Sequence, residues 1–151
     1  MNIHSDFEEF LRLLNAESTE FVIVGGYAVA FHGYVRATDD LDVFFRNSPD
    51  NVAAIRRALE AFGMPTTEEN ATAFSEPENI IRMGIAPFRI EMMNSISGLT
   101  FDDVWAHRVA GTFGEVPVTF ISLDDLLKNK REASRPKDLS DVDELGGNRS
   151  A

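Results

Sequence analysis

Residues 21–26 of the sequence, Phe-Val-Ile-Val-Gly-Gly, limit the possible folds more than any other segment. Four apolar residues in a row, without alternation, are typical of a strand buried on both faces. The two glycines that follow leave bare backbone N–H groups where the chain turns into a second apolar segment, residues 27–32. We therefore expect a central strand that runs through a glycine turn into a helix.

Apolar periodicity and capping residues predict the other elements. Helices are expected at residues 5–14 with a capping box that starts at Ser5, and at residues 48–62, 101–107, from 122 onward and 137–145. Strands are expected at residues 41–45, 79–84 and 88–93, and in a hairpin of residues 112–113 with 116–121. Residues 64–97 carry mainly strand and turn signals. This order favours the α/β class in its α+β form, a small mixed β-sheet flanked by helices, over a regular βαβ array.

Length and composition narrow the class of protein further. The 151 residues suit a single domain, expected at residues 1–145, with a flexible tail at 146–151. Acidic residues outnumber basic ones 25 to 14, and a net charge of −11 opposes broad nucleic-acid binding. The absence of cysteine excludes disulfides and thiol catalysis. The apolar run at residues 21–31 is shorter than the roughly 20 residues of a membrane span, and no secretion signal precedes it, so we expect a cytoplasmic protein without a membrane partner.

Two aspartates, Asp40 and Asp42, carry the clearest chemical signal. They are two residues apart on the expected strand, so both side chains leave the same face while Leu41 and Val43 cover the other. Neighbouring carboxylates raise each other's pKa unless a cation lies between them. Carboxylates hold Mg²⁺ together with substrate phosphates, so this spacing predicts a magnesium site. A solvated strand edge with incidental acids is the alternative.

The glycine pair adds a second signal. Backbone N–H groups at the start of a helix attract phosphate, and Gly25 and Gly26 have no side chains to block its approach. A tight turn between strand and helix is the alternative. The sequence lacks both the Gly-x-Gly-x-x-Gly motif of dinucleotide-binding proteins and the Gly-Lys-Ser/Thr of Walker loops.

One series of residues resembles the signature of the nucleotidyltransferase fold of the DNA polymerase beta type. In chain order the series is Gly25-Gly26, Arg36, Thr38 and Asp40-Leu41-Asp42. They are similar to its small prokaryotic members, which include the minimal nucleotidyltransferases and AbiEii-like toxin proteins. The resemblance implies a third carboxylate on a later strand of the same sheet. Glu91, an acid among apolar residues on the expected strand 88–93, is the best match, and an exposed strand glutamate is the alternative.

The C-terminal segment, residues 130–142, resembles the Lys-then-Arg-x-Lys-Asp-x-x-Asp segment of AbiEii-like proteins. The resemblance implies that Lys130 and Asp138 contribute to the nucleotide site. Independently, Lys130 continues the apolar stripe of its helix, and a lysine on an inward face needs an anion. A lysine paired with a nearby acid is the alternative. A basic cluster here could hold phosphate or simply be a solvated helix end: Lys128, Lys130, Arg131, Arg135 and Lys137.

Residues and resemblance together imply a Mg²⁺-dependent nucleotidyltransferase. It would move an NMP from an NTP to an acceptor hydroxyl on a protein, a tRNA or a small molecule, in a toxin–antitoxin context. The resemblance implies two Mg²⁺ ions, with Asp40, Asp42 and Glu91 as both metal ligands and catalytic residues. The expected nucleotide-binding residues are Gly25, Gly26, Arg36, Thr38, Lys130 and Asp138.

One position departs from the family pattern, because Tyr27 stands where many catalytic members carry serine, whose hydroxyl can bind phosphate. The alternative function is therefore a nucleotidyltransferase-fold module that binds a toxin or antitoxin partner without catalysis. A third is an enzyme that nucleotidylates an antibiotic. The expected partners are an NTP, an acceptor that the sequence does not specify, and a protein partner or second copy of the chain that closes the cleft.

Overall fold

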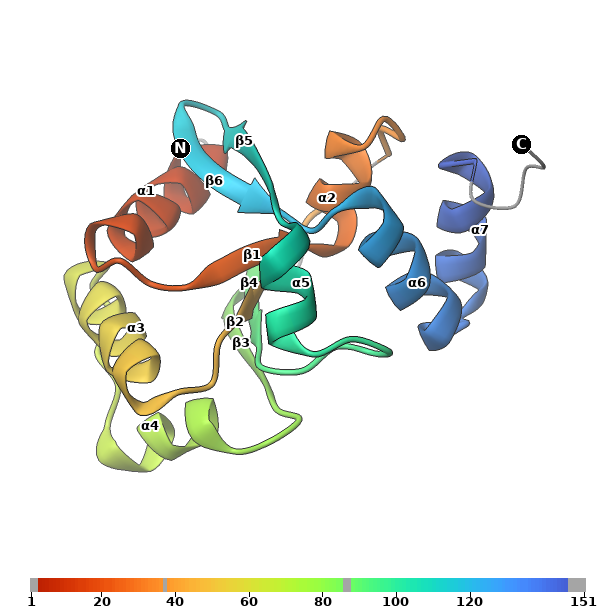
Figure 1. Cartoon of the computed structure of the whole chain (residues 1–151). Coiled ribbons are helices and arrows are strands. Elements are labelled where there is room, and N and C mark those ends of the chain that lie inside the picture. Colours follow the sequence, from red (N-terminus) through yellow and green to blue (C-terminus); the bar gives the residue numbers. More distant parts are fainter. Residues whose placement is uncertain (1–2, 37, 86–87, 147–151) are drawn as a thin grey trace.

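The computed structural model describes residues 3–36, 38–85 and 88–146 (Figure 1). All of the tail expected at 146–151 except Gly146 lies outside these residues. The helices are α1 (Ile3–Ala16), α2 (Gly25–Phe31), α3 (Pro49–Ala61), α4 (Glu68–Ser75), α5 (Phe101–His107), α6 (Leu123–Ala133) and α7 (Pro136–Glu144). The strands are β1 (Phe21–Val24), β2 (Leu41–Phe45), β3 (Ile80–Ile85), β4 (Phe88–Met93), β5 (Val109–Phe113) and β6 (Val116–Phe120).

The strands form one six-stranded sheet in the order β3-β4-β2-β1-β6-β5. The pairs β1–β2, β3–β4 and β5–β6 are antiparallel, whereas β1–β6 and β2–β4 are parallel. All four residues of β1 are buried, as the uninterrupted apolar run predicts for a strand with neighbours on both sides. The mixed sheet flanked by helices confirms the predicted fold class.

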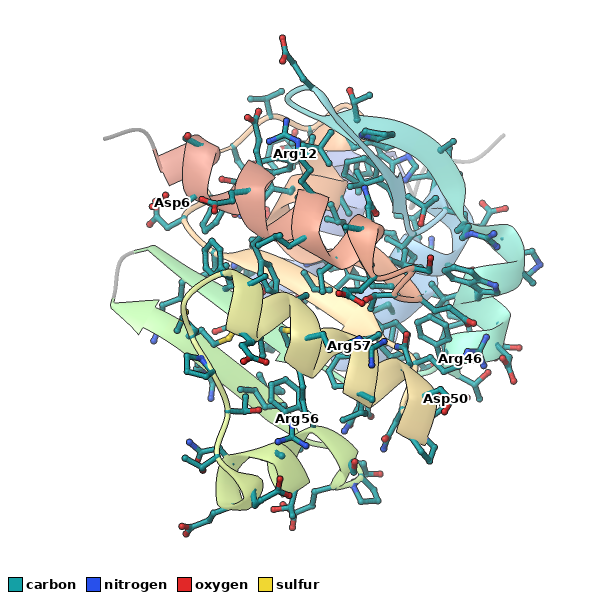
Figure 2. The ribbon with its side chains drawn as sticks, turned by 90° about the vertical axis from the view of Figure 1, so that its left-hand side faces the viewer. Asp6, Arg12, Arg46, Asp50, Arg56 and Arg57 are labelled. Atoms are coloured by element: carbon teal, nitrogen blue, oxygen red, sulfur yellow. The ribbon has the colours of Figure 1, made fainter. Side chains whose placement is uncertain are left out.

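Different helices cover the two faces of the sheet. Phe45 on β2 contacts Phe74 on α4, with the ring centroids 6.0 Å apart, and the adjacent Phe44 contacts Phe101 on α5 at 5.1 Å. Successive side chains of a strand point to opposite faces, so α4 and α5 lie on opposite sides of the sheet. Figure 2 shows α1 and α3 side by side in front of the sheet, and Figure 1 shows α6 and α7 as a pair beyond its other side.

Several predicted helix boundaries are correct because local capping fixes them. Ser48 accepts a hydrogen bond from the backbone N–H of Asn51 and starts α3, and Ser122 does the same for Asp125 at the start of α6. The prediction for α1 is wrong: the helix already begins at Ile3, which places Ser5 inside it rather than at its cap. Likewise, α2 begins directly at Gly25, two residues before the predicted start.

Helix α4 is a second correction, since it lies in the segment for which strands and turns were expected. Thr67 caps it by accepting a hydrogen bond from the backbone N–H of Asn70 at 3.1 Å. Only Ala71 and Phe74 are buried in its eight residues, so the apolar stripe is too short to show helical periodicity. Among the described residues, no helix has the length and apolar character needed to cross a membrane.

Candidate functional site

The turn between β1 and α2 places backbone directly beneath two polar side chains. Gly25 has a φ of +68°, and a Cβ built there would overlap the Oδ2 carboxylate oxygen of Asp42. A Cβ at Gly26 would overlap the Oγ1 hydroxyl of Thr38. The two glycines therefore do more than permit a turn, because they let the segment that carries Thr38 and Asp42 pack against the start of α2.

The sheet register brings the predicted carboxylates together. Asp42 lies opposite Val24 of β1 on one side and opposite Glu91 of β4 on the other. Asp40 directly precedes β2, on the same face as Asp42 by strand alternation. The Oδ1 atoms of both Asp40 and Asp42 are buried and have no hydrogen-bond partner among the described residues. Each of these two oxygens can therefore accept a cation as a ligand, because a buried carboxylate oxygen is costly unless it is paired.

The electrostatics of Asp42 point the same way. Burial raises its pKa from 3.8 to about 7, and the neighbouring carboxylates of Glu91 and then Asp40 add to the effect. The charge of Lys137 acts in the opposite direction but does not cancel it. Asp42 is therefore close to half protonated at neutral pH, and a cation that bound it would displace that proton.

The donor set fits Mg²⁺ rather than a metal that needs a complete protein cage. Within residues 3–36, 38–85 and 88–146, no group of three or more histidine and acidic side chains is arranged to hold a metal ion. Mg²⁺ does not require one, since it usually keeps several waters and takes one or two carboxylates together with substrate phosphates. Asp40 and Asp42, each with one unpaired buried oxygen, supply such a pair.

Two arginines lie beside these acids, and sequence reasoning did not single them out. Arg82 of β3 donates its Nε–H to Glu91 at 3.1 Å, and a guanidinium nitrogen of Arg89 lies 3.8 Å from Asp40 Oδ2. The register of β3 and β4 could have revealed the first contact, because Arg82 and Glu91 are equally far in sequence from Ala86-Pro87, around which the sequence predicts neighbouring strands.

Lys130 is buried, as the helical stripe predicts, and only 5% of its surface is exposed. Its ammonium group lies 3.3 Å from Asp138 and 3.2 Å from Asp141, so its charge is already shared between two buried carboxylates. Asp138 also accepts hydrogen bonds from Arg135, at 2.6 Å from Nε. Although burial opposes it, the hydrogen bonds from Arg135 and the charge of Lys130 hold the pKa of Asp138 below its ordinary value.

Arg36 joins the same network from the segment before β2. Its Nε and Nη2 atoms each lie 3.0 Å from a different carboxylate oxygen of Asp141, a two-bond geometry that fixes orientation as well as distance. The structure thus links α6 and α7 to the segment that leads to Asp40 through Lys130, Asp141 and Arg36. We name this group, together with Asp138 and Arg135, the ionic cluster.

Two basic residues at the start of α7, Arg135 and Lys137, interact electrostatically with Asp42. The charge of Asp42 contributes to the raised pKa of Arg135, after the larger effects of its hydrogen bond and charge contact with Asp138. Lys137, the second residue of α7, lowers the pKa of Asp42 in turn. Of the predicted basic cluster, Arg135 and Lys137 are therefore the members whose charges interact with that of Asp42.

Tyr27 occupies the third position of α2 and belongs to an aromatic group. Its ring packs edge-on against Phe113 at 4.9 Å and Phe7 at 6.2 Å. Burial raises the pKa of the phenol, and the charges of Asp39 and Asp40 raise it further. The hydroxyl therefore stays protonated near the aspartates and can donate a hydrogen bond there.

The comparisons with known proteins agree with this geometry. A family model described as "Nucleotidyltransferase of unknown function (DUF6036)" matches residues 2–146, nearly the whole chain. This match confirms the predicted nucleotidyltransferase assignment. A comparison with curated proteins finds no match.

Proposed function

Since the chain belongs to this family of nucleotidyltransferases of unknown function, we propose that it transfers an NMP from an NTP to an acceptor hydroxyl with the help of Mg²⁺. One observation carries the proposal. Asp40 and Asp42 each bury a carboxylate oxygen without a hydrogen-bond partner among the described residues, next to Glu91 and the glycine turn. A cation with phosphates attached satisfies both oxygens at once.

The proposed reaction makes one bond and breaks another at the α-phosphorus of the NTP. The acceptor oxygen attacks this phosphorus, the bond to the bridging oxygen breaks, and pyrophosphate leaves with the electron pair. Asp40 and Asp42 would hold Mg²⁺, which when bound neutralises phosphate charge and lowers the pKa of the acceptor hydroxyl. Glu91, beside Asp42, would complete the metal site or accept the hydroxyl proton.

Other residues bind and orient the NTP in this proposal. Gly25 and Gly26 would offer backbone N–H groups to the phosphates from the turn against which Asp42 and Thr38 pack. Arg135 and Lys137 supply positive charge from the side of α7.

Three of the expected nucleotide-binding residues would support the site rather than contact the nucleotide: Arg36, Lys130 and Asp138. Lys130 forms salt bridges with Asp138 and Asp141, and Arg36 forms one with Asp141. Thr38 packs against Gly26 and sets the position of its segment.

The experiment pairs two conservative substitutions. Wild-type protein is incubated with each α-labelled NTP, Mg²⁺ and a cell extract as the source of acceptors. We expect Asp42→Asn to reduce label transfer at least about a hundredfold, since it removes an electrostatic group that the transition state needs. Asp50→Asn is the matched control, because Asp50 lies exposed on α3 (Figure 2) and should leave transfer unchanged. Label on tRNA, protein or a small molecule identifies the acceptor.

The rival function is a module of the same fold that binds a toxin or antitoxin partner without catalysis. Tyr27 favours it, because a packed aromatic ring stands where a small hydroxyl residue would contact phosphate. The same experiment separates the two functions. Absence of label transfer with every NTP, together with absence of Mg²⁺-dependent NTP binding in equilibrium dialysis, rejects the enzyme and supports the module.

A further inference from the structure

Arg82 and Arg89 stand on the same face of the sheet as the carboxylates. Arg89 and Glu91 are two residues apart on β4, and Arg82 is the cross-strand partner of Glu91, so strand alternation places all three on one face. Asp42 follows on β2 as the next neighbour of Glu91. The row Arg82–Glu91–Asp42 thus crosses three adjacent strands, with Arg89 beside it.

Both arginines keep hydrogen-bonding capacity for a ligand. A guanidinium has five N–H donors, and within the described residues Arg82 uses only its Nε–H, toward Glu91. Arg89 makes a 3.8 Å ion pair with Asp40, while its buried Nε has no partner in the described part of the chain. Their side chains are 55% and 36% exposed, respectively, so a ligand in solvent can reach both side chains, although the Nε of Arg89 itself is buried.

The position of the pair relative to the other cations matters. Arg135 and Lys137 reach Asp42 from the α6–α7 pair, which follows β6 on the far side of β1. Arg82 and Arg89 approach from β3 and β4, the opposite end of the sheet order. The carboxylates therefore lie between two separate sources of positive charge, and in the proposed function the NTP triphosphate would use only the one at Arg135 and Lys137.

From this placement we propose that Arg82 and Arg89 form a subsite for a phosphate group of the acceptor. The inference rests on the proposed function and narrows its substrate: the acceptor hydroxyl belongs to a phosphate-bearing compound, either a free nucleotide or the 3′ end of a nucleic acid. Arginine binds phosphate through paired N–H donors, which suits both side chains. A cationic antibiotic would meet two guanidinium groups at this position and be repelled.

The test measures binding, so it does not depend on turnover. Wild-type protein is first saturated with Mg²⁺ and a non-hydrolysable ATP analogue, and this step alone reports on the proposed function. Calorimetric titrations then follow with 5′-AMP, with a 5′-phosphorylated RNA trinucleotide and with adenosine, which has the hydroxyls but no phosphate. Comparing the affinity for AMP with the affinity for the trinucleotide shows whether the acceptor is a free nucleotide or the end of a nucleic acid.

We expect wild-type protein to bind a phosphorylated probe more tightly than adenosine. Arg82→Gln and Arg89→Gln should each weaken that binding roughly tenfold or more and leave analogue binding within about twofold. Arg89→Lys keeps the positive charge but loses the paired N–H donors. Its affinity for the phosphorylated probe should therefore lie between those of wild type and Arg89→Gln. Arg57→Gln on α3 is the matched control for net charge and should bind like wild type (Figure 2).

Three outcomes overturn the subsite while the proposed function stands: adenosine binds as well as both phosphorylated probes, both glutamine variants keep wild-type affinity, or Arg57→Gln weakens binding equally. Failure of the ATP analogue to bind is a separate result: the analogues of the other NTPs are then tried, and failure of all of them rejects the proposed function instead. Thermal unfolding of each variant confirms that it is folded before titration.

Discussion

At the scale of single residues, the Asp42 carboxylate that the proposed function needs also lowers the stability of the fold when it is ionised. Its carboxylate ionises near pH 3.8 in an unfolded chain but near pH 7 in the folded one, because it is buried beside Glu91 and Asp40. Between these values the folded chain holds one proton more than the unfolded chain. The free energy of unfolding therefore falls as the pH rises through this window, and the contribution of the neutral carboxyl is lost above pH 7.

Asp42→Asn removes this ionisation and should stabilise the protein at alkaline pH. We expect a free energy of unfolding higher than that of wild type by roughly 1–3 kcal/mol at about pH 8, with a flatter profile between about pH 4 and 7. Urea unfolding across this range measures both quantities. Asp50→Asn, on the exposed surface of α3, should follow the wild-type profile. A variant at Asp42 that is less stable than wild type at pH 8 would contradict the cost assigned to the buried charge.

The carboxylates were predictable from sequence, but their cationic neighbours were only partly so. Strand alternation is a local signal, and it identified Asp40 and Asp42. Glu91 was identified as the third carboxylate that the resemblance implies, with its apolar flanks as the local signal. The contact between Arg82 and Glu91 depends on the antiparallel register of β3 and β4, in which the two residues are cross-strand partners. The pairing of Arg36 with Asp141 joins positions 105 residues apart, and no local pattern encodes such a contact.

At the scale of elements, the ionic cluster fastens the C-terminal helices to the segment before β2. Lys130→Met keeps most of the side-chain volume but leaves Asp138 and Asp141 buried with less positive charge. Removing one partner of a buried ion pair lowers the free energy of unfolding by about 3 kcal/mol or more. The loss here should lie at the lower end of that range, because Arg135 still pairs with Asp138 and Arg36 with Asp141. We expect a loss of about 3 kcal/mol in the free energy of unfolding.

Lys128→Met provides the comparison for this prediction, since Lys128 is an exposed residue on the same helix. Urea unfolding should show a change within about 0.5 kcal/mol for it. Equal effects of the two substitutions would mean that the buried lysine acts only through helix propensity and not through the ionic cluster.

Elements with strong local signals were predicted well, and those held by tertiary contacts were not. Both caps at Ser48 and Ser122 lie where the sequence indicates, because a serine side chain and a backbone N–H three residues later are enough. Helix α4 depends instead on Phe74 packing against Phe45 of β2, a partner that only the folded sheet provides. Its eight residues are too few to form a stable helix in isolation.

At the scale of the whole molecule, the net charge of −11 and the proposed phosphate contacts need to be reconciled. The cations near the carboxylates are few and local: Arg82, Arg89, Arg135 and Lys137. Beyond roughly one Debye length, about 8–10 Å at physiological salt, the acidic excess of the surface dominates. An anionic ligand is therefore attracted at the site and repelled elsewhere.

This charge distribution predicts how affinity for RNA depends on length. A protein with an extended basic surface binds longer strands more tightly and loses affinity steeply with salt, because each phosphate contact releases a counterion. Here we expect a phosphorylated trinucleotide and a dodecanucleotide to bind within about threefold of each other, with a logarithmic salt slope no steeper than about −2, as two arginine–phosphate contacts allow. Fluorescence anisotropy with both strands, at low and at physiological salt, measures length and salt dependence together. A dodecanucleotide that binds tenfold more tightly, with a slope of several units, would instead reveal an extended basic path that the acidic balance of the chain argues against.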